Sequence, residues 1–364
     1  MRTTICVAEN RPSCEPALKL LLLSLTAHSP SLEINLFYPP VTPAFFAWLK
    51  KCPQVRFQTG ALANASGWNV KPVALMQMLQ AGFEQVIWID TDIVVKKDLV
   101  PLFAPVAEEA FVVCEDALGD ERDDRNALRA RLWGFPVGRV LPFGLNSGVL
   151  RVTGHHHSLL QRWWELLQSA EYLEAQKLRW RERPFHLLGD QDVLTALLTS
   201  KYFSETRLSI LRRGKHIIQF NGVYGYTVVE RVRNLLTDGP TFVHSPGGKP
   251  WSEEWRRETG LSEFIKSIYL DLSPYTLSAL TFRKGLECDA DWMDPHYASS
   301  RILRKFGGGH PALTGLPLSL LMEVPRFVKS RRPSAHLELT LSALRQAGAG
   351  RHRHDLESTA EGGH

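Results

Sequence analysis

The chain has 364 residues and a mass of 41.1 kDa, enough for one large α/β domain with additions or for two ordinary domains. Hydrophobic residues make up 44% and charged residues 22%, which excludes a wholly disordered, collagen-like or coiled-coil chain. The net charge is +5, of which residues 326–364 supply +3, with seven Lys and Arg against four Asp and Glu. The remainder is nearly neutral, which disfavours nucleic-acid binding through a broad basic face but allows a small basic pocket for a phosphorylated ligand.

The cysteines and the apolar runs indicate where the protein works. Five cysteines, an odd number, are scattered without a CxxC pair or a zinc-like spacing, so we expect reduced thiols. The first residues lack a signal-peptide pattern, and apolar runs such as Leu20–Leu23 are far shorter than the ~20 residues of a membrane span. These features predict a cytoplasmic protein.

Strand and helix patterns alternate along the first 250 residues. The chain opens as a β-α-β unit, with strands over Thr3–Ala8 and Glu33–Tyr38 around a helix that has leucines on one face. Further predicted strands are Val86–Ile89, Phe111–Cys114, Gly148–Val152, His216–Phe220 and Thr241–Val243, and predicted helices are 71–80, 158–178 and 191–199. This alternation predicts an α/β fold, with a mostly parallel sheet covered by helices on both faces.

The pattern becomes helical and irregular after Trp251. We expect a principal domain over 1–255 and a C-terminal helical extension over 256–306, with helices in Ser252–Tyr269 and Thr276–Leu286. Residues 307–364 are expected to form a glycine linker, an amphipathic segment and a largely disordered basic tail. The apolar stretch Leu316–Val324 and the basic residues after it have two interpretations. In the first, segment 316–332 makes a peripheral contact with an anionic membrane, and in the second it packs on the domain.

An acidic pair follows the strand Val86–Ile89. This strand does not alternate apolar and polar residues, as is typical of an interior parallel strand, and it runs directly into Asp90-Thr91-Asp92. Residues i and i+2 of an extended chain project to the same side, so both carboxylates can converge on a divalent metal that compensates their repulsion. The alternative is that one Asp caps a following helix, but Ile93-Val94-Val95 is β-branched and favours an extended chain.

A second predicted strand end carries His244, followed by Ser245-Pro246-Gly247-Gly248-Lys249. An imidazole and two carboxylates suit Mn²⁺ or a similar divalent ion, and leave coordination positions for phosphate oxygens. The glycines allow backbone N–H groups to approach an anion, and Lys249 supplies a positive charge. Taken alone, His244 is more often a histidine satisfied at a strand end, and the loop a plain turn.

Other polar residues stand at predicted element ends. Lys71 begins a helix, where a cation is disfavoured unless an anion binds there, and the alternative is a solvated lysine. Asp190 and Gln191 open another helix, with Asp190 as a simple N-cap the alternative to a site role. Asn146 precedes a strand and could offer its amide to sugar hydroxyls, and Asp116 ends the strand Phe111–Cys114 as the acidic pair ends its own.

Three consecutive histidines, His155 to His157, also invite a metal interpretation. Three neighbours in sequence rarely converge on one ion, so we expect a solvated turn. Trp163 and Trp164 in the helix that follows are predicted to be packing residues.

Four motifs together resemble glycosyltransferase family 8, the retaining group that includes glycogenin and bacterial lipopolysaccharide galactosyl- and glucosyltransferases. Their order and spacing agree over residues 3 to 255. They are Val86 to Asp92, Asn146-Ser147-Gly148, Gly189 to Asp192, and His244 to Trp251. Two departures are Ser147, where Ala is usual, and Glu9-Asn10 in place of the Asp that often follows the first strand and contacts the base.

The resemblance implies a GT-A (Rossmann-like) fold and a site. It makes Asp90, Asp92 and His244 ligands of Mn²⁺ or Mg²⁺, and Gly247 and Lys249 contacts to the donor diphosphate. It implies that five further residues lie around the diphosphate and the donor sugar: Lys71, Asp116, Asn146, Asp190 and Gln191. Gln191 is implied to lie on the side of the anomeric carbon opposite the leaving group.

The predicted activity is metal-dependent transfer of a hexose, with retention, from a nucleotide-sugar, expected to be a UDP-hexose, to a hydroxyl of a glycan or glycolipid. The catalytic residues implied are Gln191, Asp190 and Lys249. We favour attack by the acceptor hydroxyl on the same face of the sugar as the one from which the leaving group departs. Double displacement through Gln191 or Asp190 stays open. The alternatives are a non-catalytic sugar-nucleotide-binding protein and a nucleotidyltransferase of related fold.

Overall fold

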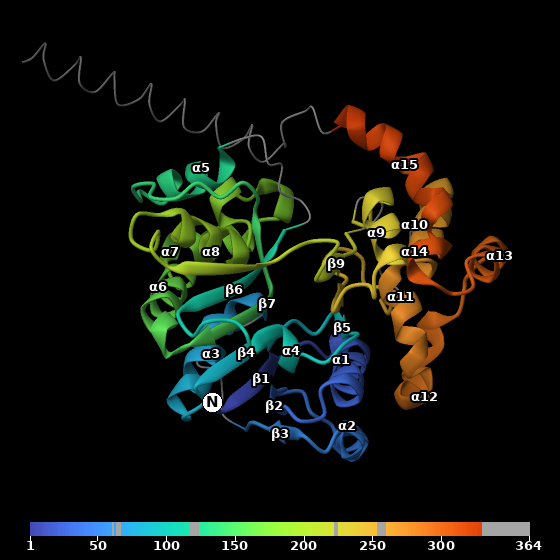
Figure 1. Ribbon diagram of the computed structural model, residues 1–364, viewed down its shortest axis with the longest axis horizontal. Coiled ribbons are helices and arrows are strands. Elements are labelled where there is room, and N and C mark those ends of the chain that lie inside the picture. Colours follow the sequence, from blue (N-terminus) through green and yellow to red (C-terminus); the bar gives the residue numbers. More distant parts are fainter. Residues whose placement is uncertain (60–61, 63–66, 117–123, 222–224, 253–259, 330–364) are drawn as a thin grey trace, which may run out of the picture.

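The computed structural model describes residues 1–329 except 60–61, 63–66, 117–123, 222–224 and 253–259. Figure 1 shows a sheet domain and, packed beside it, a group of C-terminal helices. Within this described part the main sheet has the strand order β3-β2-β1-β4-β7-β6-β8, and a second sheet has the order β5-β10-β9. Neighbouring strands of the main sheet are parallel, except that β7 runs antiparallel to both β4 and β6.

The elements follow the chain in this order. The strands are β1 Thr3–Ala8, β2 Glu33–Phe37, β3 Val55–Phe57, β4 Gln85–Ile89, β5 Ile93–Val95, β6 Ala110–Glu115, β7 Leu145–Thr153, β8 Arg207–Leu211, β9 Ile217–Gln219 and β10 Phe242–His244. The helices are α1 Glu15–His28, α2 Pro43–Trp48, α3 Lys71–Gln80, α4 Val100–Phe103, α5 Arg125–Leu132, α6 His157–Leu167, α7 Ala170–Lys177, α8 Asp190–Thr199, α9 Val228–Leu236, α10 Leu261–Asp271, α11 Pro274–Ala279, α12 Arg283–Leu286, α13 Ala298–Phe306, α14 Pro311–Thr314 and α15 Leu316–Lys329.

The predicted fold class is confirmed, because a mostly parallel sheet carries helices on both faces. Alternate residues of β4 belong to different cores. Val86 and Trp88 pack with residues of α3, α6 and α8, whereas Ile87 and Ile89 pack with residues of α1. A strand covered on both sides has no polar face, which explains the unbroken apolar run that predicted it.

The C-terminal helices pack on the edge of the domain where β5, β9 and β10 lie (Figure 1). The helix predicted over Ser252–Tyr269 begins at Leu261 in the structure, and the one over Thr276–Leu286 is two short helices, α11 and α12. The predicted domain limits stay a prediction, and the expected disordered tail lies outside the described residues beyond 329. None of the described helices is long and apolar enough to cross a bilayer.

One prediction about the three histidines is wrong for His156, whose side chain is buried. Its Nδ1 accepts from the backbone N–H of Thr153 at 3.0 Å, and its Nε2 faces the carbonyl oxygen of Glu109 at 3.2 Å. The neutral ring, protonated on Nε2, satisfies both contacts. His156 therefore closes the turn between β7 and α6 as a structural residue.

His156 predicts a loss of stability in mild acid. Burial lowers the pKa of His156 to about 4, below the value of about 6.5 that an unfolded histidine has. Between these values the unfolded chain binds the proton and the folded chain does not, so the free energy of unfolding falls as the pH falls from 6.5 towards 4. The loss attributable to this residue reaches about 3 kcal/mol near pH 4.

Urea unfolding of the wild type and of His156→Gln between pH 7.5 and 5 measures this effect. The wild type should lose about 2 kcal/mol more than the variant over that interval. His157→Gln, on the exposed neighbour, is the matched control and should follow the wild-type curve. Parallel curves for the wild type and His156→Gln would contradict the prediction.

Candidate metal centre

Asp90, Asp92 and His244 form a cluster that could hold a metal ion. Each residue offers one ligand atom, and the three atoms all lie within 4.8 Å of one another. His244 Nε2 lies 3.2 Å from Asp92 Oδ1. Residues 152 positions apart in the sequence are thus brought to one point.

Two sheets meet at the cluster. The main sheet supplies Asp90 at the end of β4, and the chain stays extended into β5, as predicted from Ile93-Val94-Val95. β10 then pairs antiparallel with β5 in a register that places His244 opposite Ile93. The backbone N–H of Ser245 donates to the carbonyl oxygen of Asp92 at 3.0 Å, which fixes the two segments together.

Gly148 on β7 leaves the space that the imidazole fills. A Cβ atom at this position would lie 2.6 Å from Cε1 of His244 and 3.0 Å from its Nδ1. The carbonyl oxygen of Gly148 also accepts from the backbone N–H of Asp90 at 2.8 Å. The glycine of the Asn146-Ser147-Gly148 motif therefore permits the close approach of β10 to β7.

The Asp90 carboxylate has two partners on the α3 side of the sheet. Trp88, two residues earlier on the same side of β4, donates from Nε1 to Asp90 Oδ1 at 2.7 Å. Lys71 Nζ lies 3.1 Å from the same carboxylate. Burial raises the pKa of Asp90, and the neighbouring Asp92 charge raises it further, whereas Lys71 opposes the shift.

The Asp92 carboxylate faces the β10 side of the cluster, where Lys249 pairs with Oδ2 and His244 contacts Oδ1. Burial pushes the pKa of Asp92 upwards, but Lys249 and His244 outweigh it and hold that pKa well below its usual range. Lys249 Nζ also donates to the carbonyl oxygen of Ser245 at 2.9 Å. In this structure the two carboxylates are thus compensated by two lysines, one on each side.

Lys71 is buried, so the alternative of a solvated lysine is wrong. Its Nζ lies 3.3 Å from Asp190 Oδ2 and donates to Ser147 Oγ at 2.7 Å, and Ser147 Oγ in turn donates to Asp190 Oδ2 at 2.7 Å. Lys71 therefore links Asp90 to Asp190 across the end of the sheet. Ser147 completes this link.

Asp190 is not the N-cap of α8. Gly189 holds that position, and Asp192 Oδ2 accepts from the Gly189 backbone N–H at 3.1 Å. The Asp190 carboxylate is free for the contacts with Ser147 and Lys71. The next residue, Gln191, accepts through Oε1 from Asn146 Nδ2 at 3.0 Å. Trp163 is a buried packing residue, as predicted, and its Nε1 donates to the carbonyl oxygen of Asp190 at 3.0 Å.

Asp116 and Gly247 lie at the border of this network. Asp116 follows β6, and its backbone N–H donates to the carbonyl oxygen of Gly144 at 2.8 Å, two residues before Asn146. Gly247 packs against Asn221, and a Cβ atom at 247 would collide with the Asn221 side chain. A larger residue at 247 would therefore displace the Asn221 side chain.

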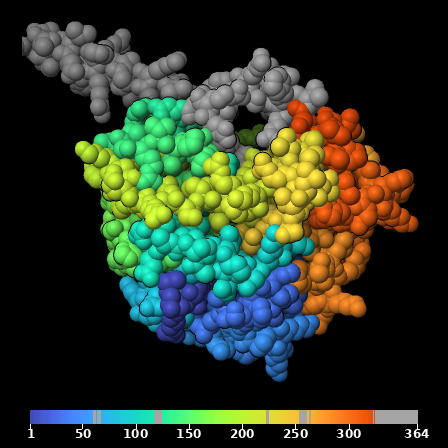
Figure 2. Space-filling view, viewed as in Figure 1, coloured from blue at the N-terminus to red at the C-terminus, as the bar shows by residue number. Residues whose placement is uncertain are grey.

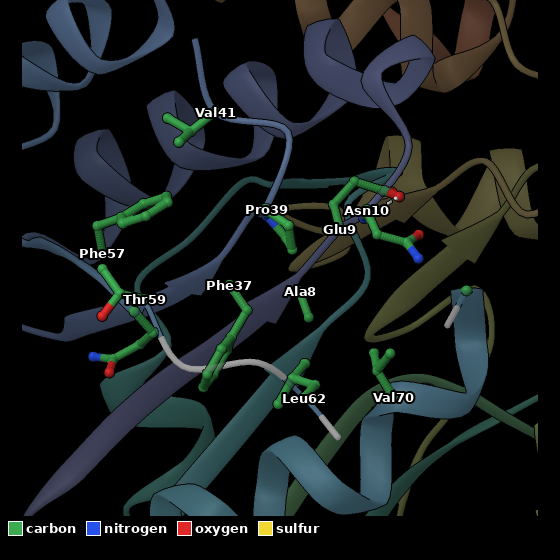
Figure 3. A pocket seen from close by; sticks show the side chains of 12 residues that line it. Ala8, Glu9, Asn10, Phe37, Pro39, Val41, Phe57, Thr59, Leu62 and Val70 are labelled. Atoms are coloured by element: carbon green, nitrogen blue, oxygen red, sulfur yellow. Dashed lines mark hydrogen bonds between the residues drawn. The ribbon is translucent and has the colours of Figure 1, made fainter. Parts of the chain in front are cut away.

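A cavity of about 560 Å³ opens beside the cluster, beyond the ends of β1, β2 and β3. Ala8, Phe37 and Phe57 line it from the three strands, and Val70 lines it from the turn before α3 (Figure 3). Glu9 and Asn10 lie at one end of the cavity and Phe57 at the other in this view. Thr91, between the two aspartates, donates to Glu9 Oε2 at 2.8 Å and so connects the cavity to the cluster.

The Glu9 carboxylate is occupied by its own loop. Its Oε1 accepts from the backbone N–H groups of Asn10 and Arg11, both at 3.0 Å, and the Arg11 side chain binds both carboxylate oxygens at 2.8 Å. Burial pushes the pKa of Glu9 upwards, but the hydrogen bonds and charge of Arg11 lower it below its ordinary value. Glu9 therefore stabilises the turn after β1.

Sequence reasoning missed several contributors. Trp88 has a signal in the sequence, since it lies two residues before Asp90 and a strand places the two side chains on one side. The tight approach of Gly148 to His244 and the role of Ser147 have none, because both depend on strands that are distant in the chain.

The cluster fits a divalent cation. Two carboxylates and an imidazole are the oxygen and nitrogen donors that Mn²⁺ and Mg²⁺ sites use. His244 is buried, and its Nδ1 has no hydrogen-bond partner among the described residues, whereas a histidine that is merely satisfied at a strand end would use that atom. A bound cation would also relieve the repulsion between Asp90 and Asp92.

Comparison with known proteins finds similarity in solved structures only. No protein-family model and no curated protein matches the sequence. Similar structures include the galactosyltransferase LgtC in complex with donor and acceptor sugar analogs, at 16% identity and a TM-score of 0.43, covering 78% of this chain and 99% of that one. Mouse xyloside xylosyltransferase 1 has 16% identity and a TM-score of 0.42, covering 67% and 97%.

A third similar structure is a glycosyltransferase involved in the glycosylation of the major capsid of PBCV-1, at 14% identity and a TM-score of 0.39, covering 68% of this chain and 95% of that one. All three are glycosyltransferases. Such distant similarities assign no residue role, so a proposal for function has to rest on the side chains described above.

Proposed function

We propose that the protein is a metal-dependent retaining glycosyltransferase that moves a hexose from a nucleotide-sugar, with UDP-hexose the expected donor, to a glycan or glycolipid hydroxyl. The observation that carries the proposal is the convergence of Asp90, Asp92 and His244 within 4.8 Å, with a lysine against each aspartate. The carboxylates can hold a metal ion, and the metal ion and the lysines can together bind an anion such as a sugar diphosphate.

Features around the cluster support a proposed position for each part of a nucleotide-sugar. The cavity between Phe37 and Val70 has the apolar walls and the polar end, at Asn10, that suit a nucleoside. Lys71 joins Asp90 to Asp190, and Asn146 contacts Gln191, and the hydrogen-bonding groups of these residues suit the hydroxyls of a sugar. The diphosphate would lie between them, at the cluster.

Asp90, Asp92 and His244 would hold Mn²⁺ or Mg²⁺, which when bound supplies positive charge to the diphosphate oxygens. Lys249 would exchange its contact with Asp92 for a phosphate oxygen and stabilise the charge that develops on the leaving group. Lys71 and Ser147 hold the Asp190 carboxylate, and Asn146 orients the Gln191 amide, beside the position proposed for the sugar. These contacts fix the proposed sugar site before the donor binds.

The turn after β1 argues against a nucleotidyltransferase. A phosphate-binding loop would present its backbone N–H groups to the phosphates, but those of Asn10 and Arg11 are bound to Glu9 Oε1. The first turn of this chain therefore lacks the free donors that the alternative needs.

Incubation of the protein with a panel of sugar nucleotides tests the proposed function. We expect hydrolysis of one or a few of them with Mn²⁺ and none with a chelator present, because a transferase site can pass its sugar to water when no acceptor is bound. Binding of a sugar nucleotide without turnover, even with added glycan acceptors, would favour the non-catalytic protein. Release of pyrophosphate from a nucleoside triphosphate incubated with a sugar 1-phosphate, in place of the sugar nucleotides, would favour the nucleotidyltransferase.

Lys249→Ala should lower turnover more than donor binding. Its positive charge is worth most when the leaving group becomes more negative, so we expect kcat to fall about 100-fold and KM to change about threefold or less. Steady-state donor hydrolysis at saturating Mn²⁺ measures both constants. Lys201→Ala, on an exposed lysine, is the control. A rise in KM with unchanged kcat would show that Lys249 only binds the donor.

A further inference from the structure

Helix α9 exposes four apolar side chains and buries three polar ones. Val229, Val232, Leu235 and Leu236 are exposed, with 66% of Val229 and 81% of Leu236 accessible to solvent. On the opposite face Glu230, Arg231 and Asn234 are buried. This is the reverse of the usual arrangement, in which the apolar stripe of a surface helix faces the core.

Specific contacts fix this orientation. Glu230 pairs with Arg213 at 2.6 Å and accepts from the backbone N–H of Thr227 at 2.7 Å. Arg231 donates to the carbonyl oxygen of Pro311 at 2.8 Å, and Asn234 donates to the hydroxyl of Tyr226 at 3.0 Å. Rotation of α9 to bury its valines and leucines would break the contacts of Glu230 with Arg213 and of Arg231 with Pro311, so the apolar face is held outwards.

Helix α15 packs beside α9 and also exposes apolar side chains. Arg231 Nε donates to Ser319 Oγ at 2.8 Å, and Glu323 accepts from the backbone N–H of Val228 at 2.6 Å, so α9 and α15 are neighbours. The next two residues after Ser319, Leu320 and Leu321, are 55% and 72% exposed. Figure 2 shows α9 in yellow beside the red-orange atoms of the last C-terminal helices on one face of the molecule.

Exposed basic residues border the apolar side chains. Arg233 of α9 is exposed. The turn at Gly214 packs against it, and a Cβ atom built at 214 would lie 3.3 Å from Arg233 Nη1. That turn carries the exposed Lys215. Asp238, shortly after α9, is an exposed acidic residue. An apolar patch beside cations is the composition of surfaces that bind anionic lipid.

We propose that the exposed face formed by Val229, Val232, Leu235 and Leu236 of α9 with Leu320 and Leu321 of α15, the α9–α15 face, lies on an anionic lipid bilayer. The apolar side chains enter the boundary between headgroups and acyl chains, and Arg233 and Lys215 contact lipid phosphates. A second copy of the chain is a less suitable occupant, because a two-fold dimer through this face would bring like charges together.

This surface differs from the one the sequence suggested. One interpretation of the sequence placed a membrane contact in segment 316–332. In the structure α9 supplies most of the exposed apolar side chains, although no sequence pattern indicated it. The inference does not rest on the proposed function, since it uses no residue of the metal cluster. If both hold, the site works beside a membrane that could present a glycolipid acceptor.

Co-sedimentation of the full chain with vesicles tests the proposal. We expect the wild type to bind vesicles of phosphatidylglycerol and phosphatidylcholine, and to bind pure phosphatidylcholine vesicles at least about tenfold more weakly. The triple variant Val229→Gln, Val232→Gln and Leu236→Gln removes apolar surface while keeping good helix formers, and should lower binding to the anionic vesicles at least about tenfold. Arg233→Gln alone should lower it about fivefold and reduce its salt dependence.

Val140→Gln is the matched control, because Val140 is also exposed, at 72%, but lies far from α9 in the chain. It should bind vesicles as the wild type does. Circular dichroism and donor hydrolysis without vesicles should be unchanged in every variant. Equal vesicle binding by the wild type and the triple variant would overturn the proposal. So would a dimer in solution that the triple variant dissociates, with no vesicle binding by the wild type.

Discussion

Asp92→Asn is expected to lower Mn²⁺-dependent donor hydrolysis at least about 1000-fold while the protein stays folded. Asp92 joins the cluster to the loop after β10, since one carboxylate oxygen contacts His244 and the other pairs with Lys249. The amide has nearly the same shape but carries no charge, so the cation would lose an anionic ligand. Lys249 keeps its hydrogen bond to the carbonyl oxygen of Ser245, and the loop after β10 should therefore persist.

Two measurements separate the metal from the chemistry. Initial rates of donor hydrolysis report turnover, and the rise in melting temperature on adding Mn²⁺ reports binding of the ion to the folded chain. Both should be lost in Asp92→Asn and retained in Asp98→Asn, which alters an exposed carboxylate six residues further on. A wild-type response to Mn²⁺ in the Asp92 variant would remove Asp92 from the ligand set.

Arg151→Leu is expected to lower the free energy of unfolding by about 4 kcal/mol. Arg151 lies on β7, and its side chain is fully buried. Its guanidinium donates to Gln85 Oε1 at 2.6 Å and to the carbonyl oxygens of Ala107 at 2.9 Å, Ala110 at 3.0 Å, Glu108 at 3.3 Å and Val106 at 3.3 Å. These bonds hold the segment between α4 and β6 against the sheet. Leucine fills part of the space but removes every bond that the guanidinium makes. The carbonyl oxygens of Ala107 and Glu108 each keep one other donor, the Ala110 backbone N–H and Thr153 Oγ1.

Urea unfolding of Arg151→Leu, Arg151→Lys and Arg162→Leu tests this role. Lysine restores a charge and up to three donors but not the planar fork, so it should recover about half of the loss. Arg162 makes an exposed ion pair with Glu165, with both side chains 46% exposed, and its replacement should cost about 0.5 kcal/mol or less. A loss below about 1 kcal/mol in Arg151→Leu would show that water replaces the guanidinium.

The sequence predicted most strands and helices because the signals that specify them are local. Thr3–Ala8 is a strand with the limits predicted, and the apolar run Val86–Ile89 is an interior strand of the sheet. The β-branched residues after Asp92 correctly indicated a continuing extended chain. Within the described part, however, local signals did not reveal that β7 runs antiparallel between β4 and β6.

The site was predictable as a set of residue types at strand and helix ends, but its contacts were not. Lys71 read alone could have been a solvated lysine, and Asp190 a helix cap. The structure instead joins Lys71 to both Asp90 and Asp190 and gives the capping role to Asp192. The Lys71 contacts cross between different elements of the fold, so no spacing within one segment encodes them, whereas the contact of Asp192 with the Gly189 backbone N–H is local to the start of α8.

Two things about this protein were determined by its amino-acid order alone: the alternation of strands and helices, and the placing of acidic residues at the carboxyl end of an interior strand. Hydrophobic periodicity and β-branching act over a few residues, and they are written in each segment. Tertiary structure decided that β10 pairs with β5, which brings His244 to Asp92, and that α9 turns its polar side inwards onto Arg213 and Ser319. Those outcomes depend on which distant partners satisfy buried charges and hydrogen bonds, and that is settled only when the whole chain has packed.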